Sequence, residues 1–390
     1  MKNSQLSYRD TWAEIDLDHI KHNVEQFKQH LPSTTGIMAV VKANAYGHGD
    51  KQVAETALNA GATSLAVAFL DEAIRLRHAG IQAPILVLGS TRARDAKVAV
   101  QYNISLNVHD VDWIGKAIEY LQEENIATPL NIHVKIDTGM GRLGIRNQQE
   151  MKEIEYILKN QEYIKLEGVF THFSNADELD LSRTQNQLLK FREILDNMEY
   201  LPPCIHTSNS AAAMRFPDAY FNTVRLGISM YGLSPSPEIK DQLPVTLKPA
   251  LSLYTKVKQI KKIVAGDTIG YGATYEAKEP EWIATLPIGY ADGWIRKLSG
   301  QSVLIKGKRA PIVGRICMDQ CMVKLCQYVP EDTPVTLIGR DGDDSITVDE
   351  IAEVLETINY EVVCQLTSRI PRVYKQDGAI VETVNQLLRY

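Results

Sequence analysis

The sequence lacks the features that mark secreted, membrane-spanning or nucleic-acid-binding proteins. Its 390 residues include only five cysteines, an odd number with no CxxC pair, so neither a disulfide framework nor a metal site is expected. No apolar run approaches the roughly 18 residues of a membrane helix, and the opening MKNSQLSYRD has no signal-peptide core. We therefore expect a cytoplasmic protein with reduced thiols.

The sequence also lacks a strong excess of either charge. The net charge is −6, with acidic and basic residues interspersed, which argues against nucleic acid or an anionic membrane as the main partner. Glycine and proline are not enriched, and the hydrophobic fraction of 44% is that of a globular protein. A chain of this length is too long for one ordinary domain, so we expect two.

The first part of the chain alternates short apolar segments with helical patterns. Eight segments are rich in Val and Ile, which is typical of parallel strands buried on both faces. The predicted strands are 37–41, 64–69, 85–89, 104–108, 130–137, 166–173, 204–208 and 223–230. The helical patterns include 72–79, 110–124, 148–158 and 181–198. Eight such units favour an α/β fold of the (β/α)8 TIM-barrel type, and a doubly wound open sheet is the alternative.

The alternation of strand and helix patterns ends after residue 232. The segment SPSPEIKDQLPVTLKP holds four prolines and is predicted to be a linker. Beyond it, turn signals separate the predicted strands 251–263, 282–286, 302–305, 322–325 and 335–338, and a helix is predicted over 348–357. We expect a barrel domain over 1–240 and a mainly β domain over 241–390, with a strand at 11–17 that pairs with the second domain.

Polar residues gather where the predicted barrel strands end. Lys42 ends the first strand inside AVVKANAYGHG, and Lys135 lies in the last part of the fifth, before TGMGRLG with Arg142. His172 lies at the end of the sixth strand, and Arg225 lies in the eighth. The carboxyl ends of barrel strands build the active site. Each residue alone could be an ordinary ion-pair or hydrogen-bonding group. Their convergence on one rim favours a functional site, because burying a lysine there is unfavourable unless something compensates.

The loops after the last two strands are the usual phosphate site of such barrels. The first offers SNSAAAM, in which Ser210 is predicted to cap a short helix whose N–H groups could bind phosphate. The second offers Gly227, which lets backbone amides approach an anion. A phosphate site opposite the strand-end Lys42 suggests pyridoxal 5′-phosphate, whose aldehyde condenses with a lysine amine.

Several long motifs, in order along nearly the whole chain, resemble the alanine racemase family. They are WAEIDL, AVVKANAYGHG, MGRLG, THFSNAD, NSAA, VRLGISMYG, GYGATYEA, PIGYADGW, GRICMDQ and RIPRVY. This resemblance implies a pyridoxal phosphate enzyme that interconverts L-alanine and D-alanine by a two-base mechanism and supplies D-alanine for peptidoglycan. It also implies a homodimer with shared active sites.

The resemblance also implies roles for individual residues. Lys42 would hold the cofactor as an internal aldimine, Arg225 would face the pyridine nitrogen, and Tyr271 would be the second catalytic base. The implied cofactor-binding set is Lys42, Tyr46, His172, Asn209, Ser210, Arg225, Gly227, Ile228 and Tyr374. The implied substrate-binding residues are Arg142, Met318 and Asp319, with Lys135 as a carbamylation site, Tyr290 and Arg296 at the entrance, and no metal.

Three other functions stay open at this point. A pyridoxal phosphate carrier without catalysis would need no second domain, and a decarboxylase on the same barrel would typically place an acid where Arg225 stands. Arginine has no acceptor and favours an unprotonated ring nitrogen, which should limit transamination. A racemase of broader specificity, acting on serine, is the alternative within the same chemistry, since one small group changes binding by only ~1–3 kcal/mol.

Overall fold

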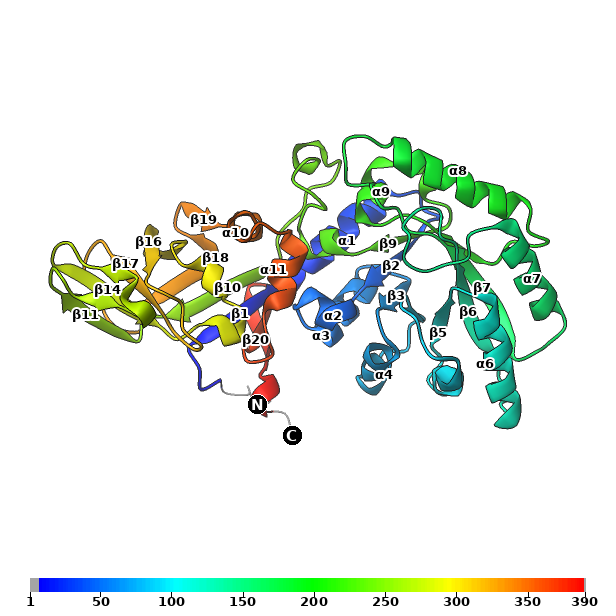
Figure 1. Ribbon diagram of the computed structural model, residues 1–390, viewed down its shortest axis with the longest axis horizontal. Coiled ribbons are helices and arrows are strands. Elements are labelled where there is room, and N and C mark those ends of the chain that lie inside the picture. Colours follow the sequence, from blue (N-terminus) through cyan, green and yellow to red (C-terminus); the bar gives the residue numbers. More distant parts are fainter. Residues whose placement is uncertain (1–6, 389–390) are drawn as a thin grey trace. The chain divides into compact units, whose positions relative to one another are not determined.

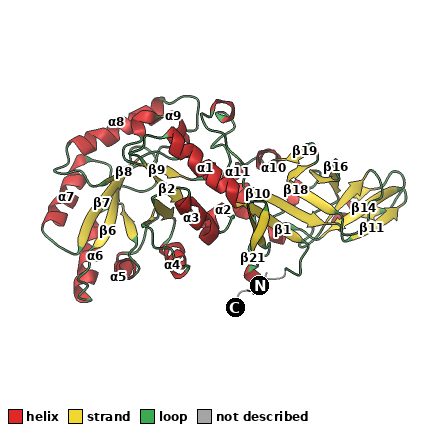
Figure 2. Ribbon diagram, turned by 180° about the vertical axis from the view of Figure 1, so that it is seen from behind, coloured by secondary structure: helices red, strands yellow, loops and turns green. Residues whose placement is uncertain are grey.

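The computed structural model describes residues 7–388 and divides into two compact units, of which the first is a closed parallel barrel. This unit holds residues 20–45 and 50–248, and Figures 1 and 2 show its strands with helices α6 to α8 outside them. The strands are β2 (Gly36–Val40), β3 (Ser64–Val67), β4 (Ile85–Val87), β5 (Ser105–Val108), β6 (Leu130–Lys135), β7 (Ile164–Phe170), β8 (Cys204–His206) and β9 (Thr223–Leu226). The predicted (β/α)8 fold is therefore confirmed, and the doubly wound alternative is wrong.

The barrel helices start where the sequence offers caps. The Asp110 side chain accepts from the Trp113 N–H at the start of α6, and Asn147 accepts from the Glu150 N–H at the start of α7. The helices are α1 (Leu17–His30), α3 (Asp50–Asn59), α4 (Leu70–His78), α5 (Ala96–Gln101), α6 (Val111–Glu123), α7 (Gln148–Lys159), α8 (Ser182–Asp196) and α9 (Ser210–Arg215). None of the helices among residues 7–388 is long and apolar enough to cross a membrane.

The proline-rich segment expected as a linker packs onto the barrel unit instead. Ile239 is fully buried in a hydrophobic cluster with Phe173 and Phe216, and Leu243 of the same segment packs against this cluster. The compact barrel unit consequently extends to Lys248.

The second unit combines three stretches of chain around one large sheet. Of the described residues, it holds 7–19, the short segment Tyr46–Gly49, and 249–388. The sheet order is β11-β14-β17-β16-β15-β18-β10-β1-β20-β21, with β19 beside β18. Strand β1 (Thr11–Asp16) lies between β10 and β20, antiparallel to the former and parallel to the latter. Residues 1–6 of the polar N-terminus lie outside the described residues.

The other elements of this unit include the predicted strand regions, together with strands at 268–269, 275–276, 308–313, 344–346, 372–376 and 379–384 that were not predicted. The strands are β10 (Leu251–Lys256), β11 (Gln259–Ile263), β12 (Thr268–Ile269), β13 (Tyr275–Glu276), β14 (Glu281–Leu286), β15 (Ser302–Ile305), β16 (Lys308–Val313), β17 (Cys321–Leu325), β18 (Pro334–Asp341), β19 (Asp344–Ile346), β20 (Arg372–Gln376) and β21 (Ala379–Val384). The helices are α10 (Val348–Leu355), close to prediction, and α11 (Asn359–Gln365), which was not predicted.

The prediction of a single strand over 251–263 was wrong. The Val257 N–H bonds to the Thr333 carbonyl, while the next N–H, that of Lys258, bonds to the Thr285 carbonyl. The chain thus changes partner at this point, from β18 to β14. Continuous apolar alternation in the sequence cannot reveal such a change of partner.

Candidate active site

Lys42 begins a left-handed turn at the end of the first barrel strand. In α2 (Lys42–Tyr46), the φ angles of Ala43, Asn44 and Ala45 are 53°, 53° and 52°. Left-handed backbone costs non-glycine residues ~1–2 kcal/mol each, so surrounding contacts must hold it. The carboxylate of Glu72 supplies one such contact, accepting the Ala43 N–H at 2.7 Å. The turn fixes the position from which the lysine side chain leaves the strand.

Four cationic side chains, including that of Lys42, lie around one rim of the barrel. Lys135 is 3% exposed, and burial, with Arg142 and Arg225 next in effect, lowers its pKa to about 8. Burial also holds the pKa of His172 well below its usual range, followed by the effects of Arg225, Arg142, Lys135 and Lys42. The structure therefore brings these five predicted residues together, with His172 neutral among positive charges. Such a site suits an anionic cofactor and a substrate carboxylate.

Arg225 lies in β9, is 3% exposed, and uses its terminal N–H groups within the barrel. Nη1 donates to Nδ1 and to the carbonyl of His206, at 2.7 and 2.9 Å. Nη2 donates to the carbonyls of Thr171 and Thr207, both at 2.8 Å, and lies 3.2 Å from Nδ1 of His172. Among the described residues, Nε–H has no acceptor, so this donor is available to a ring nitrogen.

The predicted phosphate loops meet, but the cap differs from the prediction. Asn209, not Ser210, caps α9, because its side chain accepts the Ala212 N–H at 3.0 Å. The Ser210 hydroxyl accepts the Gly227 N–H at 3.0 Å, which joins the loop after β8 to the loop after β9. Ile228 follows directly and is 1% exposed. The structure thus gathers Asn209, Ser210, Gly227 and Ile228.

The remaining predicted cofactor residues belong to the second unit. Tyr46 is buried there, and burial raises its pKa; its ring lies 6.2 Å, between centroids, from that of Tyr360. Tyr374 packs against Gly49, where an added Cβ would lie 1.8 Å from the Tyr374 hydroxyl oxygen. Sequence reasoning missed Tyr360, because it lies in α11, for which no helix or motif was predicted.

Two loops of the second unit carry exposed apolar side chains that were predicted for the site. Tyr271, in the turn between β12 and β13, is 71% exposed, and Met318 is 53% exposed. Ile269 and Cys317, beside these two residues, pack in one hydrophobic cluster. The two loops are therefore neighbours. Together they expose an apolar surface of the kind that often contacts another molecule.

A third loop, with Tyr290 and Asp292, joins this pair. Tyr290 is 40% exposed, and its N–H donates to the Cys317 carbonyl at 3.0 Å, as the Ala291 N–H does to that of Met318. The structure therefore brings Tyr290 beside Met318. Arg296, in the 3-10 turn Arg296–Leu298, is exposed to solvent.

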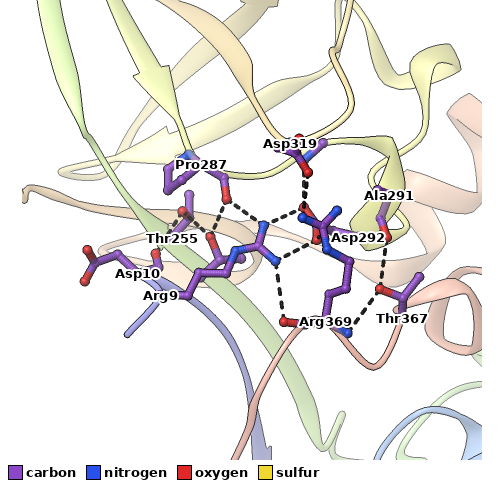
Figure 3. Close-up of polar contacts among 11 residues, drawn as sticks. Arg9, Asp10, Thr255, Pro287, Ala291, Asp292, Asp319, Thr367 and Arg369 are labelled. Carbon is purple, nitrogen blue, oxygen red and sulfur yellow. Dashed lines mark hydrogen bonds and ion pairs between the residues drawn. The ribbon is translucent and has the colours of Figure 1, made fainter. Parts of the chain in front are cut away.

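A fully buried carboxylate, that of Asp292, anchors this loop (Figure 3). Its two oxygens accept from Arg9 at 2.6 and 2.5 Å, and one of them also accepts the Gly289 N–H at 3.0 Å. Arg369 lies 3.6 Å away and donates to Asp319 at 2.6 Å. The predicted substrate residue Asp319 is thus tied to the same anchor. Asp292 stands in the motif PIGYADGW, but sequence reasoning gave it no role.

Comparisons with known proteins agree with this geometry. Family profiles described as the N-terminal and C-terminal domains of alanine racemase match residues 15–235 and 250–374. An alanine racemase of Geobacillus kaustophilus is 53% identical, covering 98% of this chain and 99% of the relative.

Solved structures are similar over the same length. The alanine racemase of Bacillus anthracis with bound L-Ala-P has a TM-score of 0.95 at 50% identity, covering 98% of this chain and 99% of that one. A histidine racemase from Leuconostoc mesenteroides has a TM-score of 0.89 at 33% identity, covering 96% and 100%.

Proposed function

Because the chain belongs to the alanine racemase family, we propose that it is an isomerase that interconverts L-alanine and D-alanine with pyridoxal 5′-phosphate. The observation that carries this proposal is the strand-end Lys42 in a cluster of cations around a neutral His172. The residues present fit the cofactor, since Arg225 keeps one donor without an acceptor among the described residues. We place the protein in the cytoplasm, in line with its five cysteines, none of which forms a disulfide in the described part of the chain.

The chain's own groups would hold the cofactor by its two ends. Lys42 would bind the aldehyde carbon, and Nε–H of Arg225 would face the ring nitrogen. The phosphate end would lie against Tyr46, Asn209, Ser210, Gly227, Ile228 and Tyr374. When bound, the cofactor delocalises the electron pair that remains after the α-proton leaves. Arg225 has no acceptor and so favours an unprotonated ring nitrogen, which restricts protonation to the α-carbon.

Racemisation needs one proton acceptor and one proton donor on opposite faces of the α-carbon. Lys42 would serve one face through its Nζ, and Tyr271 would serve the other through its hydroxyl. Arg142 and the Met318 N–H would hold the substrate carboxylate. Tyr271, Tyr290 and Met318 are exposed within their own unit, which supports a homodimer in which the partner subunit covers them.

Lys135 is suited to carbamylation. Its amine must be neutral to attack carbon dioxide, forming a C–N bond and releasing a proton, and burial lowers its pKa to about 8. The resulting anion would lie among Arg142, Arg225 and Lys42, where it lowers the local excess of positive charge. A carbamate would also accept hydrogen bonds and so orient Arg142.

The proposed substrate is alanine, and D-alanine would supply peptidoglycan synthesis. The alternative is a racemase that acts on a broader range of amino acids, since a histidine racemase is among the similar solved structures. A hydrophobic pocket discriminates one small added group by only ~1–3 kcal/mol, so slow serine turnover is compatible with the proposal. Exchange of the α-hydrogen in heavy water, measured for alanine, serine and lysine, ranks these substrates. Carbon dioxide release from lysine without α-exchange in alanine would contradict the proposal.

Shared active sites are tested separately by mixing variants. Neither Lys42→Ala nor Tyr271→Phe should racemise alanine at the wild-type rate. If each site takes one residue from each subunit, hybrid dimers contain one intact site, so mixing should restore up to about one quarter of the wild-type activity at random exchange. No recovery after subunit exchange, verified by native mass spectrometry, would exclude shared sites.

A further inference from the structure

The buried guanidinium of Arg225 has no carboxylate beside it. Among the described residues, no Asp or Glu oxygen lies within 4.0 Å of a nitrogen of the Arg225 side chain. Buried charges are usually paired directly, since an unpaired ion in the protein interior is strongly destabilised. Burial lowers the pKa of Arg225 to about 10, yet the group stays cationic near neutral pH. Its counter-charge must therefore be sought further along its hydrogen bonds.

A chain of hydrogen bonds, buried at Arg225 and partly buried at its far end, leads from Arg225 to Glu167. Arg225 Nη1 lies 2.7 Å from Nδ1 of His206, whose Nε2 lies 2.8 Å from Nδ1 of His133. Nε2 of His133 lies 3.1 Å from Oε2 of Glu167, and the Ser105 hydroxyl donates to the same oxygen at 2.5 Å. These five residues come one each from the consecutive strands β5 to β9.

The donor chemistry fixes the direction of every bond in this chain. A guanidinium can only donate, so Nδ1 of His206 is an acceptor and its proton lies on Nε2. That proton makes Nδ1 of His133 an acceptor in turn, and leaves the His133 proton on Nε2, facing the carboxylate. Burial, then Arg225, holds the pKa of His206 well below its usual range, which keeps this ring neutral. Burial alone would raise the pKa of Glu167, but the hydrogen bonds from His133 and Ser105 lower it overall.

The backbone is shaped to make these contacts. Ile132 pairs with Leu166, but the next residue, His133, pairs with Gly168, so Glu167 is the extra residue of a β-bulge. Bulges redirect a side chain and are frequent near active sites. A Cβ on Gly168 would lie 2.4 Å from Nδ1 of His133, so only glycine leaves room for the ring.

One face of the relay is closed by an aromatic ring. Phe170 stacks on His206, with ring centroids 4.7 Å apart and planes 8° apart, and the Arg225 guanidinium carbon lies 5.5 Å from the same ring. His133 and His206 are 3% and 0% exposed, so protein groups, and not solvent, determine the hydrogen bonds of the two rings.

We propose that Ser105, Glu167, His133 and His206 form a one-way hydrogen-bond relay that positions the Arg225 guanidinium and holds its counter-charge two imidazoles away. This inference rests on the proposed function for its consequence, because Arg225 would meet the cofactor's ring nitrogen. A carboxylate beside Arg225 would compete for the donors that face the cofactor. The relay instead uses two neutral rings as acceptors and leaves Nε–H without an acceptor among the described residues. Glu167 is thus a positioning residue and not a catalytic one.

A metal ion is the main competing use of these residues. The ligand atoms of His133, Cys204 and His206 lie within 4.8 Å of one another. A metal bridging both rings would have to replace the 2.8 Å hydrogen bond between them. Burial also raises the pKa of the Cys204 thiol, which disfavours the thiolate that a metal needs.

The first test reads the tautomers in the holoenzyme by ¹⁵N NMR of the histidine rings at pH 8. Signals of the nine histidines are assigned to His133 and His206 by single replacement with glutamine. The relay predicts that both rings are neutral, with the proton on Nε2 and a bare Nδ1. A proton on Nδ1 of either ring, a doubly protonated ring, or stoichiometric zinc bound through them would overturn the proposal.

The second test measures pyruvate formed per alanine racemised, in the holoenzyme. Pyruvate arises when the amino group stays on the cofactor and the alanine skeleton leaves oxidised. Glu167→Leu removes the final acceptor and should raise this ratio about tenfold, the effect of an unsatisfied buried donor. Glu167→Gln, whose amide oxygen can accept both hydrogen bonds, should restore most of the wild-type ratio. A merely structural glutamate would lower stability without changing the ratio.

The matched control is Glu155→Leu. Glu155 is a buried glutamate of the barrel unit, at 3% exposure, whereas the Glu167 side chain is 31% exposed. The Glu155 carboxylate accepts the backbone N–H of Glu199 and lies outside the relay. This variant should leave the ratio unchanged. Equal ratios for both leucine variants would contradict the relay. If the wild type racemises no alanine, the proposed function fails, whereas the NMR result still decides the relay.

Discussion

The barrel unit buries a cation, Arg225, and the second unit buries an anion, Asp292, and the two meet their counter-charges differently. Asp292 accepts directly from Arg9 at 2.6 and 2.5 Å, with Arg369 at 3.6 Å. Arg225 reaches the carboxylate of Glu167 only through two histidine rings. Direct pairing suits a group that must only hold a loop in place. Indirect pairing leaves a charged group available to a ligand.

The same contrast applies to exposure around each group. Tyr290, in the loop anchored by Asp292, is 40% exposed to solvent. Met318, in the neighbouring loop, is 53% exposed. Arg225 lies in a strand that is buried throughout. The anchor therefore holds loops that the proposed partner subunit would cover, while the relay orders a buried residue of the barrel itself.

The largest expected effect comes from breaking the direct pair. Asp292→Asn leaves Arg9 without its charge partner while keeping the side chain's shape, and should lower the free energy of unfolding by ~3–5 kcal/mol. Denaturant titration measures this loss. The control is Asp344→Asn in the exposed pair with Arg309, which should change stability little. A loss no larger than the control's would mean that Asp292 is not an anchor.

A smaller effect, on catalytic activity, is expected when the guanidinium group of Arg225 is replaced by an amine. Arg225→Lys keeps the positive charge but cannot donate to His206, Thr171 and Thr207 together. Misplacement of such a group by about 1 Å can reduce turnover ~100-fold, so kcat should fall by this order. Steady-state racemisation, with circular dichroism to verify folding, provides the measurement. Unchanged kcat would show that charge alone suffices and that orientation is unimportant.

The smallest effect concerns the pH dependence of stability. Burial lowers the pKa of Lys135 from its ordinary value of 10.5 to about 8, so the folded protein binds fewer protons than the unfolded chain between these values. The free energy of unfolding should therefore rise with pH in this window, by about 1 kcal/mol between pH 8 and 9. Lys135→Met should remove this rise in carbon-dioxide-free buffer. A wild-type curve that is flat or falls relative to Lys135→Met would contradict a lowered pKa.

The barrel could be predicted from the sequence because its physical signal is local. Most strands from β2 to β9 are short segments rich in Val, Ile and Leu between helical patterns, as expected for parallel strands buried on both faces. The strand-end position of Lys42 follows from the same pattern. The predicted cap at Ser210 was wrong by one residue, because Asn209 is equally suited to capping and the sequence does not distinguish them.

The features that were missed depend on contacts between distant residues. The partner change after Lys256, the relay through Glu167 and the packing of Tyr360 against Tyr46 all join segments far apart in the chain. The bulge at Glu167 adds one residue to β7 without altering its apolar pattern, so periodicity gives no sign of it.

The most direct test of the proposed function is to locate the cofactor on the chain. The purified protein is treated with borohydride, digested, and mapped by mass spectrometry for a peptide that carries a reduced pyridoxal phosphate. We predict a yellow protein that borohydride bleaches, with the adduct on Lys42 alone. A colourless protein that takes up no pyridoxal phosphate, or an adduct on another lysine such as Lys135, would contradict the proposal.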